Sequence, residues 1–159
     1  MRRYLVATVV LIAVAAAWIE ALPPAAATQP IAFPHARHQT LDCTVCHRGA
    51  ATAARAGLPE ITLCARCHAT APAGTAAVWD GAVAARSISW VQIEHLPDHV
   101  LFSHRRHVTL GKIECATCHG PMAERTTPPS TALVSFSMDF CLDCHQQKKV
   151  STACVDCHR

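Results

Sequence analysis

The hydrophobic and polar positions of this chain divide it into segments of different character. An uninterrupted apolar run covers residues 4–19, behind the basic Arg2 and Arg3. An alanine-rich stretch follows much later, at residues 69–86. Residues 87–95 (SISWVQIEH) alternate apolar and polar positions, as a β-strand with one buried face does. The pattern therefore predicts one strand, at residues 87–95, in a chain otherwise made of short helices and irregular segments.

The apolar run at residues 4–19 predicts an export segment. It has a basic start and is followed by the Pro23-Pro24 break and the small residues 25–27, which suit signal peptidase. The run is slightly long for a signal core and slightly short for a membrane span of about 20 residues. Two alternatives stay open for residues 1–27, a cleaved signal peptide or a transmembrane helix that anchors the protein. Either one places residues 28–159 on the periplasmic side of the cytoplasmic membrane.

Composition shows that the side chains alone make a poor core. The chain has 159 residues and is 51% hydrophobic, but only 5% of its residues are aromatic and alanine is abundant. Alanine buries little area, and stabilisation scales with buried apolar area at roughly 25 cal/mol per Å². Something other than large side chains must fill the interior. The ten cysteines and eleven histidines indicate what it is.

All ten cysteines fall in five copies of one pentad, Cys-x-x-Cys-His. The copies are CTVCH, CARCH, CATCH, CLDCH and CVDCH, at residues 43–47, 64–68, 115–119, 141–145 and 154–158. A disulfide within each pair would close a single turn of chain and stabilise little. The first two pairs taken alone have the spacing of a four-cysteine zinc ribbon. A zinc site, however, does not need the histidine that follows every pair.

Covalent c-type haem explains each position of the pentad. Cysteines three apart lie one helical turn apart on the same face, where both thiols can bond to the two vinyl groups of a porphyrin. The sequence therefore predicts five covalently bound c-type haems, attached through Cys43, Cys46, Cys64, Cys67, Cys115, Cys118, Cys141, Cys144, Cys154 and Cys157. The proximal iron ligands are then His47, His68, His119, His145 and His158. We expect a mostly irregular, short-helical multihaem cytochrome c fold with little β structure, in which the haems form the core.

An internal repeat divides the pentahaem domain, residues 28–159, into two units. FPHARHQTLDCTVCH begins at Phe33 and FSHRRHVTLGKIECATCH begins at Phe102, and both read Phe-x-His-x-Arg-His-x-Thr-Leu before a pentad. Unit A covers residues 33–68 with two pentads, and unit B covers residues 102–158 with three. The six histidines outside the pentads suffice to give each of five irons a second ligand. They are His35, His38, His95, His99, His104 and His107.

Phe-x-His-x-x-His ahead of Cys-x-x-Cys-His resembles the class III multihaem cytochromes c. The stretches WVQIEHLPDHVLFSHRRHV, CATCHGPM and MDFCLDCH further resemble the pentahaem cytochrome subunit of alternative complex III and related membrane quinol-oxidising complexes. The resemblance implies that the first histidine of each repeat is the distal ligand of the haem that follows, and the second that of the next haem. The implied assignments are His35 for the haem of Cys43/Cys46, His38 for Cys64/Cys67, His104 for Cys115/Cys118 and His107 for Cys141/Cys144.

The last haem has no ligand assigned by the repeat. Unit B lacks a histidine between its first two pentads and carries Met122 and Met138 there instead. The haem of Cys154/Cys157 must then take His95, His99 or a methionine. We expect His95, because it ends the strand-like segment, with His99 as the spare histidine and Met138 as the rival ligand.

Two histidines on each iron leave no coordination position for a substrate. The resemblance accordingly implies an electron carrier rather than an enzyme. It would pass electrons between a membrane quinol-oxidising or reductase complex and a soluble periplasmic carrier. The alternative is a multihaem reductase with one open-coordination haem. The formal net charge of +3 does not indicate a nucleic-acid partner, because the propionates of five haems would reverse it and no basic run carries interleaved aromatics.

The pentads predict a fixed stoichiometry. Because thioether bonds survive acid–acetone extraction, the intact mass of the extracted protein should exceed that of the bare chain by five haems. A mass that corresponds to bound zinc or to five disulfides would contradict the haem interpretation.

Overall fold

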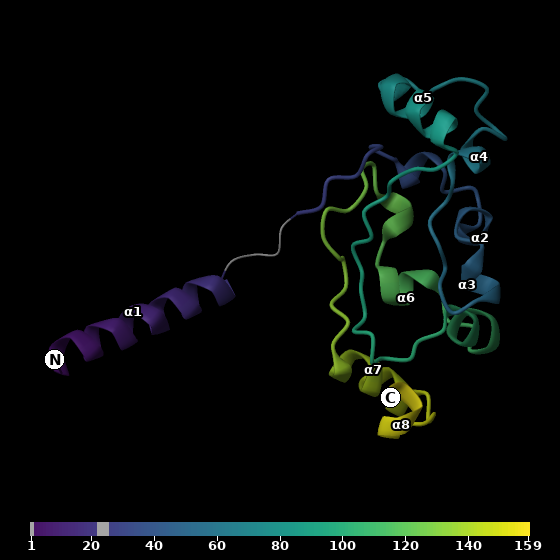
Figure 1. Cartoon of the computed structure of the whole chain (residues 1–159). Coiled ribbons are helices and arrows are strands. Elements are labelled where there is room, and N and C mark those ends of the chain that lie inside the picture. The colour runs from purple at the N-terminus through teal and green to yellow at the C-terminus, as the bar shows by residue number, and fades with distance from the viewer. Residues whose placement is uncertain (1, 22–25) are drawn as a thin grey trace.

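The computed structural model describes residues 2–21 and 26–159, so the Pro23-Pro24 break and Ala25 of the predicted export segment lie outside the described residues. Short helices joined by irregular segments make up the chain, as expected from the sequence (Figure 1). They are α1 (Arg2–Ala21), η1 (His35–Arg37), α2 (Cys43–Cys46), α3 (Gly49–Thr52), α4 (Ile61–Cys64), α5 (Ala76–Ala85), η2 (Arg105–Leu110), α6 (Cys115–His119), η3 (Met122–Glu124), α7 (Met138–Gln147) and α8 (Cys154–Cys157).

The N-terminal helix α1 contains the apolar run of residues 4–19 and is drawn apart from the other helices in Figure 1. Its large side chains, among them Tyr4, Leu5 and Trp18, are exposed. Within the part of the chain that the structure describes, no helix is both long enough and apolar enough to cross a membrane.

The strand predicted at residues 87–95 is wrong. Across residues 2–21 and 26–159 the structure contains no strand, and the β pairing there is one isolated antiparallel bridge between Val100 and His158. Residues 88–97 are irregular and have no strand beside them. The alternation arises instead because Ile88 is buried and Trp90 is half-buried against α4 and α5.

A single side chain takes the place of a neighbouring strand for this segment. The amide of Gln29 donates from Nε2 to the carbonyl oxygen of Val91 over 2.7 Å. Its Oε1 accepts from the backbone N–H of Val91 over 3.0 Å. Trp90 adds a third anchor, since its Nε1 donates to the carbonyl oxygen of Pro59 over 2.8 Å. These three hydrogen bonds fix the conformation of residues 90–91 in place of the hydrogen bonds that a neighbouring strand would make.

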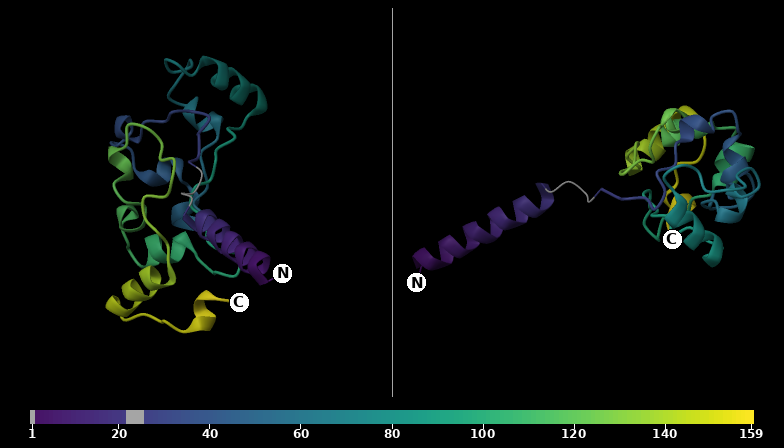
Figure 2. Two further views of the ribbon diagram at one scale, coloured as in Figure 1. Left: turned by 90° about the vertical axis from the view of Figure 1, so that its left-hand side faces the viewer. Right: turned by 90° about the horizontal axis from the view of Figure 1, so that it is seen from above.

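The side chains form one small hydrophobic cluster, at the end of the molecule where α4 and α5 lie. Its buried members are Ile61, Trp79, Ala82 and Ile88. Figures 1 and 2 both place α4 and α5 at one end and α7 and α8 at the other, with α6 between them. The cluster therefore stabilises one end of the molecule only.

The two repeat units pack against each other reciprocally. The histidine segment of unit B, at η2, lies on α3, which follows the first pentad of unit A. The backbone N–H groups of His104 and Arg105 donate to the carbonyl oxygens of Ala54 and Ala53, each over 3.0 Å. The hydroxyl of Thr109 donates to the carbonyl oxygen of Ala51 over 2.7 Å.

The histidine segment of unit A makes the matching contact on unit B. Helix η1 lies against η3, which follows the first pentad of unit B. The N–H of Ala36 donates to the carbonyl oxygen of Arg125 over 2.9 Å. Each unit thus places its histidine segment on the chain just after the first pentad of the other unit.

The hydrophobic cluster predicts a stability effect that is separate from the pentads. Ile61 is 1% exposed. Ile61→Ala should therefore lower the free energy of unfolding by about 2–5 kcal/mol, as large-to-small core substitutions do. Guanidinium denaturation followed by far-UV circular dichroism measures it. Val78→Ala is the control, because Val78 is 38% exposed and its truncation should cost less than about 1 kcal/mol. Equal losses in the two variants would contradict this description of the core.

Candidate haem-attachment sites

Each pentad forms a helical turn that brings its three reactive side chains together. In three pentads the backbone N–H of the histidine donates to the carbonyl oxygen of the first cysteine. These bonds are His47 to Cys43 at 2.8 Å, His68 to Cys64 at 3.0 Å and His158 to Cys154 at 2.8 Å. The other two pentads lie within α6 and α7. All five pentads therefore have the one-turn geometry that the spacing predicts.

Side-chain caps help to start two of these helices. The carboxylate of Asp42 accepts from the backbone N–H of Thr44 over 2.8 Å at the start of α2. The hydroxyl of Ser137 accepts from the N–H of Phe140 over 3.1 Å at the start of α7. Such caps satisfy N–H groups that have no partner within the helix. They place the first cysteine of each pentad at a defined point of the turn.

Four pentad histidines each face the ring of a histidine from elsewhere in the chain. The ring centroids are 6.2 Å apart for His38 and His68, 6.2 Å for His104 and His119, 6.1 Å for His107 and His145, and 5.5 Å for His99 and His158. A metal about 2 Å from each of two imidazole nitrogens, each nitrogen roughly 1.1 Å from its ring centre, requires centroids about 6.2 Å apart. Three of the pairs thus have the separation that one iron between two histidines needs, whereas the rings of His99 and His158 lie closer together than that.

The remaining pentad histidine is His47, whose expected partner is His35. Burial lowers the pKa of His35, and the charges of His47, His38 and Arg125 lower it further. The charge of His47 thus acts on His35, and their pairing on one haem, which the resemblance to class III cytochromes implies, stays a prediction. Nδ1 of His35 and Nε of Arg125 are both buried without a hydrogen-bond partner. A carboxylate such as a haem propionate would satisfy both donors.

One phenylalanine in each repeat fixes two of the facing histidines. Phe33 meets the ring of His35 edge-on at 4.9 Å and stacks on that of His38 at 4.5 Å. Phe102 meets His104 at 4.9 Å and stacks on His107 at 4.5 Å. The repeat is therefore structural as well as sequential, and its phenylalanine orients two rings at once. The sequence shows this residue in both repeats, but not its role.

In the C-terminal pentad, the histidine ring that lies next to His158 is that of His99. The isolated bridge at Val100 brings this segment against the end of the chain. The backbone N–H of Leu101 donates to the carbonyl oxygen of Cys157 over 2.7 Å. The backbone N–H of Arg159 donates to the backbone carbonyl oxygen of His99 over 3.3 Å. The rings of His99 and His158 are consequently stacked, with 21° between their planes.

The other two candidates for the last haem are placed differently. Nε2 of His95 lies 2.9 Å from the carbonyl oxygen of Gln92 in its own turn. Met138 starts α7, and its side chain is 64% exposed. Within the part of the chain that the structure describes, the ring that lies against His158 is that of His99, and neither His95 nor Met138 makes such a contact. The ligand of this haem remains a prediction, but the geometry favours His99.

Backbone carbonyls orient five of the ten paired histidine rings. Nδ1 lies against a carbonyl oxygen in His38 (Pro34, 3.1 Å), His47 (Gly57, 2.8 Å), His104 (Ala54, 2.9 Å), His107 (Ser103, 2.9 Å) and His145 (Ser151, 2.7 Å). A carbonyl can only accept, so Nδ1 is the donor and Nε2 keeps its lone pair for a metal. Gly57 reaches His47 with φ of 77°, a conformation that glycine adopts freely.

His119 differs, because its partner is a carboxylate. Its Nδ1 lies 2.8 Å from Oε2 of Glu94. The hydrogen bond and the charge of Glu94 raise the pKa of His119, against the opposing effect of burial. The sequence analysis missed Glu94, which is one residue before the favoured His95. A lone glutamate in an irregular segment gives no signal in the sequence that could have identified it.

The pentads lie in a definite spatial order along the molecule. Figure 1 shows the corresponding helices in the sequence α4, α2, α6, α7 and α8. The pentads therefore follow one another as 64–68, 43–47, 115–119, 141–145 and 154–158. The thiols agree with this order, because burial raises the pKa of four cysteines and a thiol of the next pentad raises it further. The neighbours are Cys46 for Cys64, Cys43 for Cys115, Cys144 for Cys118, and Cys157 for Cys141.

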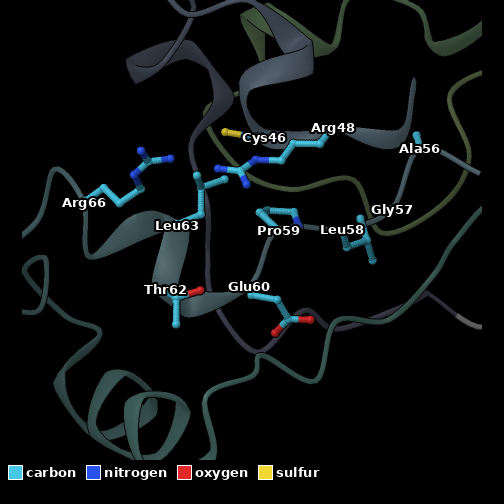
Figure 3. A pocket seen from close by; sticks show the side chains of 10 residues that line it. All are labelled: Cys46, Arg48, Ala56, Gly57, Leu58, Pro59, Glu60, Thr62, Leu63 and Arg66. Atoms are coloured by element: carbon cyan, nitrogen blue, oxygen red, sulfur yellow. The ribbon is translucent and has the colours of Figure 1, made fainter. Parts of the chain in front are cut away.

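A cavity of about 430 Å³ lies between the first two pentads (Figure 3). Cys46, Leu63 and Pro59 line it, together with the guanidinium groups of Arg48 and Arg66, which point toward the same region beside the sulfur. Its volume is in the range of cofactor sites. Its wall is mixed, since Glu60 and Thr62 also line it, and the two guanidinium groups suit the propionates of a porphyrin. Paired histidines, thiols on one turn and partnerless donors together fit c-type haem.

No group of three or more His, Cys, Asp or Glu side chains is arranged to hold a metal ion within residues 2–21 and 26–159. A haem iron takes four of its ligands from the porphyrin and needs only two from the protein. Pairs of histidines, rather than larger clusters, are therefore the arrangement that this cofactor requires.

Comparison with known proteins agrees with this chemistry. Residues 13–88 match the class III cytochrome c family, and residues 100–159 match cytochrome c7 and related cytochromes c. The chain is also 27% identical, over 161 aligned residues, to a protein of Nitratidesulfovibrio vulgaris named as the multiheme cytochrome c subunit of menaquinone reductase. The alignment covers 82% of this chain and 77% of that relative.

The phenylalanine contacts predict that one substitution affects two haems. In Phe33→Ala the rings of His35 and His38 lose the surface that orients them, so two haems should gain a high-spin fraction while the other haems stay low-spin. Phe102→Ala should affect two different haems. Electron paramagnetic resonance of the ferric protein measures both effects. Leu41→Ala is the control, because Leu41 is 47% exposed and should leave every haem unchanged. A change confined to one haem would contradict the shared role.

Proposed function

We propose that this chain is a class III multihaem cytochrome c and that it carries electrons along five covalently attached haems. Class III cytochromes are electron carriers and not catalysts of a substrate's conversion. Five pentads of the required geometry support the number of haems. When bound, each haem supplies a one-electron couple between ferric and ferrous iron. The chain itself supplies attachment, axial ligands and the order of the sites.

The observation that carries this proposal is the set of facing histidine rings. Four pairs have centroid separations of 5.5–6.2 Å, and we take His35 and His47 as the fifth because the charge of His47 acts on His35. The proposed pairs are His35/His47, His38/His68, His104/His119, His107/His145 and His99/His158. With every iron held by two histidines, no position is open to a substrate. The arrangement thus supports electron transfer over a reductase with an open haem.

The spatial order of the pentads supports a path with two ends. It starts at the pentad 64–68 in unit A, passes from 43–47 to 115–119 between the units, and ends at the pentad 154–158 near the C-terminus. Within each unit, two histidines three residues apart serve neighbouring pentads. We propose that electrons enter at one end of this path and leave at the other.

The partners follow from the named relative. That protein is described as a subunit of menaquinone reductase. We propose that this chain likewise belongs to a membrane quinone-linked complex on the periplasmic side and exchanges electrons there with a soluble carrier. Membership in alternative complex III itself is supported only by the motifs of residues 90–108, 115–122 and 138–145.

The proposed ligands predict a uniform spin state. The ferric protein should give only low-spin signals, from five haems, because two imidazoles produce a strong ligand field. Electron paramagnetic resonance with spin quantitation checks this. A high-spin signal from one haem in the unmodified protein would contradict the proposal and support the reductase.

Two matched variants then identify the last ligand. His99→Ala should turn one haem high-spin, whereas His95→Ala should leave all five low-spin. Met138→Ala should have no effect either, because its side chain is exposed. The opposite result for the two histidines would restore His95 as the ligand, and an effect of Met138→Ala would contradict the all-histidine arrangement.

A further inference from the structure

One facing histidine is oriented by a charged group. Nδ1 of His119 lies 2.8 Å from Oε2 of Glu94. Five other ligand candidates in the described residues, His38, His47, His104, His107 and His145, have a backbone carbonyl in the same place. A carboxylate carries a full negative charge and accepts a shorter, stronger hydrogen bond than a neutral carbonyl does. The histidine of the middle pentad therefore differs from these five in having a charged hydrogen-bond partner.

The position of Glu94 is set by its own segment. The side chain of Gln92 donates from Nε2 to the carbonyl oxygen of Glu94 over 2.8 Å. Just before it, Val91 is held on both its backbone groups by the amide of Gln29. These contacts fix the backbone on either side of the glutamate. Its carboxylate is consequently presented to His119 by a constrained segment and not by a free loop.

The contact is partly shielded from solvent. The side chains of His119 and Glu94 are 35% and 20% exposed. The opposite side of the site holds the ring of His104, within 4° of parallel to that of His119, and the edge of Phe136. Electrostatic effects are stronger where water is excluded than in free solution. A charge at this distance therefore acts on the imidazole with only partial screening by water.

We propose that Glu94 is a positioning residue that holds His119 and lowers the reduction potential of the haem attached to Cys115 and Cys118. A carboxylate that accepts the Nδ1 proton makes the imidazole a stronger electron donor through Nε2. A stronger axial donor stabilises ferric over ferrous iron, and hydrogen bonding to axial ligands is a recognised way for a protein to set potentials. The inference rests on the proposed function only in that a haem is bound at this pentad.

The location gives this effect a role in electron flow. The pentad 115–119 lies third of five in the spatial order, with two pentads on either side. A haem of lowered potential there would divide the path into two pairs, each holding electrons more favourably than the site between them. Electrons would then pass from one pair to the other through this central site.

The test is a redox titration of the loaded protein and its Glu94→Gln variant. Glutamine keeps the shape and one acceptor oxygen but removes the charge. One of the five midpoint potentials should rise and the g-values of one low-spin signal should change, while the other four haems stay as they were. Glu94→Asp keeps the charge on a shorter side chain and should give a smaller rise. Glu114→Gln is the matched control, because Glu114 is an exposed carboxylate beside the same pentad and should leave the potentials unchanged.

A second substitution identifies the haem that responds. His104→Met should raise the potential of the haem of Cys115/Cys118, because a methionine ligand raises it. The midpoint potential that rises in Glu94→Gln must be the one that rises in His104→Met. The proposal is overturned if all five potentials are unchanged in Glu94→Gln, if a different component moves, or if Glu114→Gln moves them equally. None of these results would affect the haem count or the low-spin state, which test the proposed function.

Discussion

The packing of two imidazoles on one phenylalanine is the interaction on which the arrangement of this protein depends. In each repeat a single ring meets one histidine edge-on and stacks on the next. Because the two histidines are only three residues apart, orienting one of them also orients the other. The ligands of two neighbouring sites are therefore fixed by one local contact. A chain with few large side chains can in this way position several cofactors without a large core of its own.

The packing of the two repeat units against each other sets the rest of the arrangement. Unit B places its histidine segment on α3, and unit A places its own on η3. The contact between the units is thus made by the same segments that supply the distal ligands. Any movement of one unit against the other would shift ligands in both, so the spacing between the central sites is linked to their coordination.

The sequence predicts those parts of the site that depend on local geometry. The pentads determine attachment because three reactive side chains share one turn. The resemblance of the Phe-x-His-x-x-His segments implied four pairs, and in three of them the two histidine rings lie 6.1–6.2 Å apart. The last pair could not be predicted, because His99 reaches His158 through a bridge between segments more than 50 residues apart, and nothing near either residue indicates it. The strand at residues 87–95 was predicted from alternation alone, whereas Gln29, 62 residues away from Val91, satisfies its backbone. Glu94 could not be predicted either, because its contact with His119 joins residues 25 positions apart in the sequence.

The hydrogen bonds between the units also bear on the order in which the protein is made. The carbonyl oxygen of Ala54 accepts from His104, which is synthesised 50 residues later, and that of Ala51 accepts from Thr109. Unit A therefore cannot reach its final packing before the histidine segment of unit B has been made. The order of synthesis thus differs from the order of packing, because the first unit depends on the second for part of its hydrogen bonding.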